Sequence, residues 1–146
     1  MGINSSLYQL YFNCELATKE EVHAFIAEIV GQNNPISPEE VIQQLMDREK
    51  VGSTMIAEHV LLPHIESEQL EKSQILFLRL AKPIENWDFQ TKNICLIIVI
   101  LLKKNESVNM KKRIASFTRS LADEEYLDRL INSQEKAAFI NEIIKY

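Results

Sequence analysis

The sequence predicts an α/β protein with a single domain, in which a mixed β-sheet is sandwiched between α-helices. The chain has 146 residues, of which 46% are hydrophobic, and this is enough for one domain with its own core. Two short and nearly unbroken apolar runs, residues 73–80 and 93–102, are typical of strands that are covered on both faces. Helical patterns precede and follow these runs, and we therefore expect residues 1–146 to form one domain.

The first predicted elements are a strand and a helix. Residues 5–12 (SSLYQLYF) are rich in residues that favour β-structure. Thr18 and Glu21 have the spacing of a capping box, in which a hydroxyl and a carboxylate accept hydrogen bonds from N–H groups at the start of a helix. His23 lies off the apolar stripe of this helix, so we expect it at the surface. The stripe consists of Val22, Phe25, Ile26, Ile29 and Val30.

A second helix and a strand follow. Ser37 is the expected N-cap, Pro38 suits the first turn, Glu40 completes a capping box, and Gly52 lies just past the predicted end of the helix. The apolar residues between 54 and 62 no longer have a period of 3.6, which favours a strand. The two buried strands come next along the chain.

After the last strand the pattern is helical again, and two or three helices are predicted. Ser133 is the expected helix cap between the second and the third of them. The three apolar stripes are Met110, Ile114, Phe117 and Leu121, then Tyr126, Leu127, Leu130 and Ile131, and finally Phe139, Ile140, Ile143 and Ile144.

Composition excludes several classes of function. The formal net charge of -5 speaks against a nucleic-acid partner, because binding phosphates needs an excess of basic groups. Cys14 and Cys95 lie far apart without metal-ligand spacing, so we expect no disulfide framework, no metal, no cofactor and a reducing cytoplasmic location. The longest apolar run, residues 94–102, is too short for a bilayer, which needs about 20 residues, so no membrane insertion is expected.

His64 is the first candidate for chemistry. It follows Pro63, and proline has no N–H to give to a ladder, so we expect the strand to end there and His64 to lie at the rim of the sheet. Ligands of α/β proteins bind at such rims. A neutral imidazole can act as a nucleophile, a base or a ligand. The alternative is a partly buried histidine that is bonded to a backbone carbonyl.

Arg48 and Thr54 are the other candidate site residues. The stretch DREKVGST combines a helix end, a turn of small residues and a strand, and these can bring a guanidinium and a hydroxyl to the imidazole of His64. Arg48 would offer a planar set of donors to phosphate oxygens, and Thr54 a hydroxyl. The alternatives are a favourable charge near a helix C-terminus for Arg48 and a solvated surface position for Glu49.

The motifs REKVGST, LLPH and KPIENW together resemble the EIIA domain of the fructose and mannitol type in the bacterial phosphoenolpyruvate-dependent sugar phosphotransferase system (PTS). The similarity covers nearly the whole chain, from ATKEEV, where Lys19 matches a common family lysine, to LADEEYLDRLINSQEKAAFINEII. The resemblance implies a phosphotransferase that acts as a phosphohistidine carrier in sugar transport. His64 would accept a phosphoryl group from phosphorylated HPr and pass it to a cysteine of an EIIB domain.

The chain departs from the family pattern in two ways. Met55, Ala57 and His59 stand where glycines are usual, and Met110 stands where transporter members have a second active-site histidine. Two alternatives to the carrier therefore remain: an EIIA-like module that senses phosphorylation in a transcription regulator with PTS regulation domains, or an inert binding domain of the same fold. His59 and His64 have opposite strand parity, so His59 is expected to face solvent or to be satisfied in the core.

Overall fold

A computed structural model describes residues 7–143, which form two compact units that divide between residues 104 and 105. Ser5 and Ser6 of the first predicted strand and Ile144 of the last apolar stripe lie outside the described residues. Within this described part of the chain, no helix is both long and apolar enough to span a bilayer.

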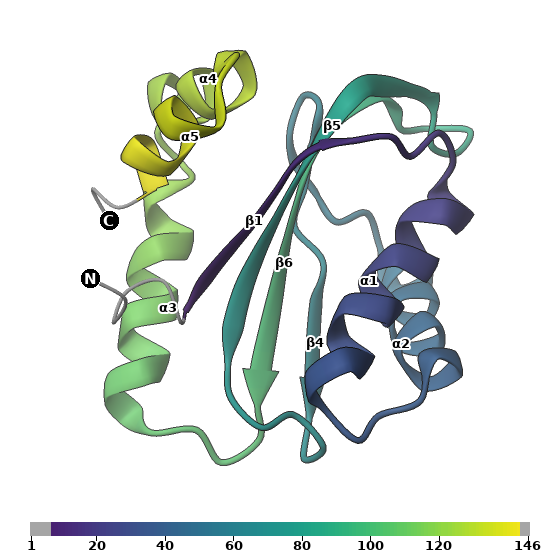
Figure 1. The fold of residues 1–146 in the computed structure, drawn as a ribbon, viewed down its shortest axis with the longest axis vertical. Coiled ribbons are helices and arrows are strands. Elements are labelled where there is room, and N and C mark those ends of the chain that lie inside the picture. Colours follow the sequence, from purple (N-terminus) through teal and green to yellow (C-terminus); the bar gives the residue numbers. More distant parts are fainter. Residues whose placement is uncertain (1–6, 144–146) are drawn as a thin grey trace. The chain divides into compact units, whose positions relative to one another are not determined.

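The first unit contains a six-stranded mixed sheet with the strand order β1-β5-β6-β3-β2, in which β4 also pairs with β6. Figure 1 shows the strands β1, β5, β6 and β4 of this sheet. β1 runs parallel to β5, β3 and β4 run parallel to β6, and the pairs β5–β6 and β2–β3 are antiparallel. The predicted α/β class with a mixed sheet is confirmed. The strands are β1 (Tyr8–Cys14), β2 (Met55–Ala57), β3 (Val60–Leu61), β4 (His64–Ser67), β5 (Gln74–Asn86) and β6 (Lys92–Lys103).

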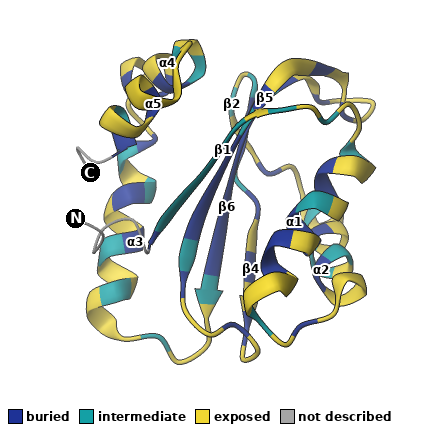
Figure 2. Ribbon diagram, in the orientation of Figure 1, coloured by how far each residue is buried: buried dark blue, intermediate teal, exposed yellow. Residues whose placement is uncertain are grey.

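The central strands are buried on both faces over residues 75–78 of β5 and residues 96–101 of β6, as predicted (Figure 2). Alternate residues point to opposite faces of a strand, and here residues of both parities are inaccessible to solvent. β5 is longer than predicted because it continues past an irregularity between Arg79 and Ile84. One face of the two strands contributes Leu76, Leu78, Ile97, Val99 and Leu101 to the main core of this unit.

Helices α1 (Lys19–Asn33) and α2 (Pro38–Val51) pack against each other and share this core. Their predicted starts are confirmed, since the hydroxyl of Thr18 accepts a hydrogen bond from the N–H of Glu21 and that of Ser37 from the N–H of Glu40. Each bond satisfies an N–H that a helix start otherwise leaves open. Gly52 is the C-cap of α2, in an extended conformation.

The prediction of one strand over residues 54–62 is wrong. β2 and β3 form a hairpin, which turns at His59 in the left-handed region with φ 72°. The expectation that pairing ends at Pro63 is also wrong, because β4 begins at His64 directly after it. Proline has no N–H to donate, but the carbonyl of Pro63 accepts a hydrogen bond from the N–H of Ile100, 3.0 Å away. The chain therefore stays paired with β6 on both sides of Pro63.

The second unit contains the helices α3 (Val108–Ser120), α4 (Glu124–Asn132) and α5 (Lys136–Ile143). Their residues Ile114, Phe117, Tyr126, Leu127, Leu130, Phe139 and Ile143 are buried, which confirms most of the predicted stripes.

Two details in the second unit concern the predicted cap and the third apolar stripe. Ser133 caps the C-terminus of α4, where its hydroxyl donates to the carbonyl of Arg129, so the predicted cap between the last two stripes is confirmed. Ile140, placed on the third apolar stripe, is exposed. Arg129 and Glu142 form an ion pair between α4 and α5 at 2.8 Å.

Candidate functional site

His64 is an exposed residue at the start of β4. The burial of β4 alternates along the strand, with His64 and Glu66 exposed and Ile65 and Ser67 buried. Pro63, on the other side of His64, is buried as well. Among the described residues none hydrogen-bonds to the imidazole, so the alternative of a histidine satisfied by a carbonyl does not apply. Buried neighbours on both sides hold the backbone and leave the ring accessible to a partner.

Arg48 lies in the last turn of α2, and its Nη1 donates a hydrogen bond to the carbonyl of Gly52 at 3.2 Å. The side chain therefore satisfies one of the carbonyls that a helix end leaves open. A guanidinium has five N–H donors, so further donors remain for an anion. Within residues 7–143, no hydrogen bond or ion pair joins Arg48 to His64.

Thr54 is only 5% exposed. Its carbonyl accepts a hydrogen bond of 2.8 Å from the N–H of Leu62, across the base of the β2–β3 hairpin. Thr54 and Pro63 also line the same narrow cavity. The hairpin thus brings Thr54 to the segment that leads directly into His64, although no hydrogen bond between the two residues occurs in the described part of the chain.

Glu49 is a half-buried charged residue that sequence analysis missed. Its side chain is 17% exposed, with Lys19 Nζ 2.6 Å from Oε1 and Trp87 Nε1 donating to Oε2 at 2.8 Å. The alternative of a solvated surface position is therefore wrong for Glu49. A signal was present, since a buried tryptophan usually needs an acceptor for its indole N–H and Lys19 had already been singled out in the resemblance.

The prediction that His23 lies at the surface is wrong. His23 is 6% exposed, and its ring packs edge-on against Trp87, with 5.9 Å between centroids and 72° between planes. Burial lowers the pKa of His23 below its usual 6.5, although the nearby Glu49 carboxylate acts in the opposite direction. A neutral, packed histidine next to a tryptophan cannot be inferred from the helical period alone, because Trp87 comes from a distant loop.

His59 lies in the turn of the hairpin rather than in a strand, so the parity argument does not apply to it. Its Nδ1 is 2.7 Å from the carbonyl oxygen of Asn93, which ties the turn to the start of β6. Of the three positions where the family usually has glycine, only His59 has a positive φ, whereas Met55 and Ala57 are the ends of β2. Glycine's conformational freedom is therefore relevant at position 59 alone.

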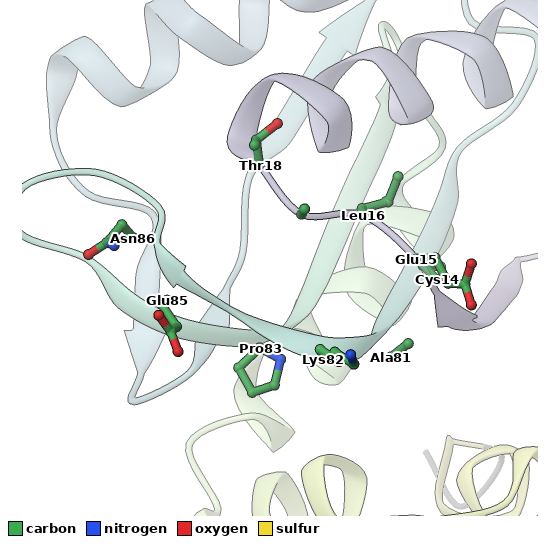
Figure 3. Close-up of a pocket in the computed structure, with 10 residues that line it drawn as sticks. Cys14, Glu15, Leu16, Thr18, Ala81, Lys82, Pro83, Glu85 and Asn86 are labelled. Carbon is green, nitrogen blue, oxygen red and sulfur yellow. The ribbon is translucent and has the colours of Figure 1, made fainter.

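The described part of the first unit contains cavities of different size. One of about 140 Å³ lies beside Thr54. A larger one of about 650 Å³ lies between residues 14–18 and residues 81–86 (Figure 3), and neither His64, Arg48 nor Thr54 lines it. The smaller cavity is lined by Glu49, Gly52, Ser53, Thr54, Leu61, Asp88, Gln90 and Thr91.

In the described range, no three His, Cys, Asp or Glu side chains gather as metal ligands would. Cys14 and Cys95 are free thiols, and burial raises the pKa of both.

Met110, at the expected place of a second histidine, lies in the first turn of α3. Its N–H donates to the hydroxyl of the N-cap Ser107 at 3.1 Å. The residue is half-buried, and a thioether cannot carry a phosphoryl group as an imidazole can. The chain has no histidine after His64.

These features define the class of protein. It is an α/β protein whose mixed sheet has an exposed histidine in a strand, directly after a buried proline. Residues 7–146 match the family described as "Phosphoenolpyruvate-dependent sugar phosphotransferase system, EIIA 2". The chain belongs to this family, and the resemblance found in its motifs is confirmed.

Curated relatives include a nitrogen regulatory protein of Bradyrhizobium diazoefficiens, 30% identical over 129 residues, which are 88% of this chain and 82% of the relative. The mannitol-specific EIICBA component of Klebsiella pneumoniae is 30% identical over 135 residues, and multiphosphoryl transfer protein 1 of Escherichia coli is 26% identical over 136. The aligned regions cover 87% and 92% of this chain, respectively. They span only 21% and 16% of those two longer proteins.

Solved structures have the same fold. The crystal structure of IIA mannitol from Escherichia coli has a TM-score of 0.68 and 26% identity, and the match covers 92% of this chain and 95% of that one. The nitrogen regulatory protein IIA-Ntr from Neisseria meningitidis has a TM-score of 0.78 at 16% identity, with 97% and 99% covered.

Proposed function

We propose that the protein is a phosphoryl carrier of the PTS, in which His64 accepts a phosphoryl group from phosphorylated HPr and passes it to a cysteine of an EIIB domain. The observation that carries this proposal is the exposed, unbonded imidazole of His64 at the start of β4 in a chain of the EIIA 2 family. A partner protein must reach the ring, and a location in the cytoplasm follows from such partners.

The transfer makes and breaks one bond in each step. A neutral ring nitrogen of His64 attacks phosphorus as the P–N bond to the HPr histidine breaks. In the second step a cysteine thiolate of EIIB forms a P–S bond as the P–N bond to His64 breaks. Little covalent work is left to the protein, so alignment and stabilisation of the equatorial oxygens dominate. We assign that stabilisation to Arg48 and Thr54.

A phosphorylation-sensing regulator is the second candidate. The methionine at position 110 favours it, and so does the likeness to a nitrogen regulatory protein over most of that relative's length. In this role the phosphoryl group on His64 would stay in place and change the local charge by nearly two units. Its partner would then be a transcription regulator with PTS regulation domains, rather than EIIB.

Incubation with phosphoenolpyruvate, enzyme I and HPr, followed by mass measurement under alkaline conditions, tests these proposals. We expect one added phosphoryl group, which His64→Ala removes and the matched control His59→Ala retains. Loss of the label on adding EIIB identifies a carrier, and a label that EIIB leaves in place identifies a regulator. A chain that takes up no label is an inert binding domain, and both proposals are then wrong.

A further inference from the structure

We propose that Glu49 is a positioning residue of the His64 site, held by Lys19 and Trp87, an inference that rests on the proposed phosphotransfer function. Glu49 does not touch the reacting atoms in this proposal. It holds the end of α2, and through it Arg48 and the turn that leads to Thr54, in the geometry that the transfer needs.

The contacts of Glu49 join three segments that are far apart in the sequence. Lys19 is the first residue of α1, Glu49 lies in the last turn of α2, and Trp87 lies between β5 and β6. The carboxylate takes one donor from each side, at 2.6 Å from Lys19 and 2.8 Å from Trp87. A largely buried carboxylate needs such partners, because an unpaired buried charge is strongly destabilising.

The Trp87 side of this contact is itself held in place. The N–H of Trp87 donates to the carbonyl of Thr91, and the Asp88 carboxylate accepts from the N–H groups of Gln90 and Thr91. These hydrogen bonds lie within the loop, so they fix its conformation independently of its contact with α2. An indole N–H presented by such a loop is a fixed donor, and it defines where the Glu49 carboxylate lies.

The same residues border the backbone that leads to His64. Glu49, Trp87 and His23 line a narrow cavity of about 10 Å³ together with Thr54 and Pro63. So little space accommodates at most one water molecule. A displacement of the Glu49 side chain is therefore passed on to Pro63, the residue before His64, and to Thr54.

Arg48 links the same turn to the proposed chemistry. It precedes Glu49 in α2, and its guanidinium donates to the carbonyl of Gly52 two residues before Thr54. When the carboxylate of Glu49 is pinned on both sides, the last turn of α2 cannot rotate freely. Arg48 and Thr54, the two proposed hydrogen-bond donors to the phosphoryl oxygens, are then held in defined positions. This lowers the entropic cost of reaching the transfer geometry.

The kinetic test measures phosphoryl transfer to His64 over a range of phosphorylated HPr concentrations. We expect Glu49→Ala to lower the maximal rate roughly tenfold or more with little change in the half-saturating HPr concentration, since misplacement affects the transfer step. Glu49→Gln keeps an oxygen acceptor for Trp87 and should recover part of the rate. The matched control is Asp47→Asn, which removes an exposed carboxylate from the same helix end and should change nothing.

A spectroscopic test needs no phosphoryl transfer. The chain has a single tryptophan, so its indole N–H gives one assignable ¹⁵N–¹H NMR signal. In Glu49→Ala we expect this signal to shift and its hydrogen exchange to accelerate, together with shifts of the Gly52, Ser53, Thr54 and His64 amides. Trp87→Phe should slow transfer in the same way while it keeps the ring packed against His23.

The outcomes separate the two proposals. If wild-type protein is phosphorylated and Glu49→Ala transfers at the wild-type rate, the positioning role is wrong and the proposed function stands. If wild-type protein takes no phosphoryl group, the proposed function is wrong. In that case, if the amide NMR signals of residues 52–54 are unchanged in Glu49→Ala, the positioning role is wrong too. If these signals shift, Glu49 still fixes the structure of the turn.

Discussion

His64 and His23 carry the same side chain in opposite surroundings. His64 is exposed at the start of a strand, where the alternation of β4 turns it outward while Pro63 and Ile65 are buried. His23 is buried on α1 against Trp87, next to the charged pair of Glu49 and Lys19. The difference shows that accessibility, rather than residue type, decides which imidazole can meet a partner and which one supports the core.

The largest expected effect is the loss of phosphorylation when His64, the exposed histidine, is replaced. His64→Ala should abolish phosphorylation by HPr and leave the melting temperature nearly unchanged, because an exposed side chain contributes little packing. Mass measurement and thermal unfolding of the same preparation check both parts. A variant that still takes up one phosphoryl group would place the acceptor elsewhere.

Changes next to the buried His23 should affect the free energy of unfolding. Trp87→Ala should lower the free energy of unfolding by roughly 3–5 kcal/mol, because it removes a buried aromatic side chain and leaves Glu49 without its indole donor. Phe89→Ala is the matched control two residues away, since Phe89 is fully exposed and should unfold as wild type does. Urea unfolding measures both. Equal losses in the two variants would contradict the buried contact.

Acidification sharpens the comparison at His23. Burial lowers the pKa of this imidazole below its usual 6.5, so well above pH 6.5 the ring is neutral in both the folded and the unfolded chain. As the pH falls below 6.5 the unfolded chain binds the proton first, and the free energy of unfolding should decrease until the folded pKa is passed. His23→Phe should lose part of this decrease. Urea unfolding at pH 7.5 and 5.0 measures this decrease in both proteins. An equal decrease in the wild type and in His23→Phe would contradict the prediction.

The smallest effect concerns His59, the third histidine. A non-glycine residue with φ 72° is strained by about 1 kcal/mol, and glycine would remove that strain. His59→Gly should therefore destabilise the protein less than His59→Ala, since both lose the contact to the Asn93 carbonyl. Melting temperatures rank the two variants. A more stable alanine variant would show that the turn relaxes to a different conformation.

Local features were predictable because their causes lie within a few residues. The caps at Thr18 and Ser37 depend on a hydroxyl and an N–H three positions apart, and the structure has both bonds. The buried strands β5 and β6 follow from continuous apolar runs. The exposed His64 was also predicted, although its reason differs, because β4 begins at His64 instead of a strand ending before it.

The sequence by itself determined the α/β class, the family and the candidate histidine, since these depend on local patterns and on motifs that can be read along the chain. Only the tertiary structure decided that His23 is buried and that Glu49 is paired with Lys19 and Trp87. Such contacts join residues from separate elements. They arise only when folding brings those elements together, and no local period encodes them.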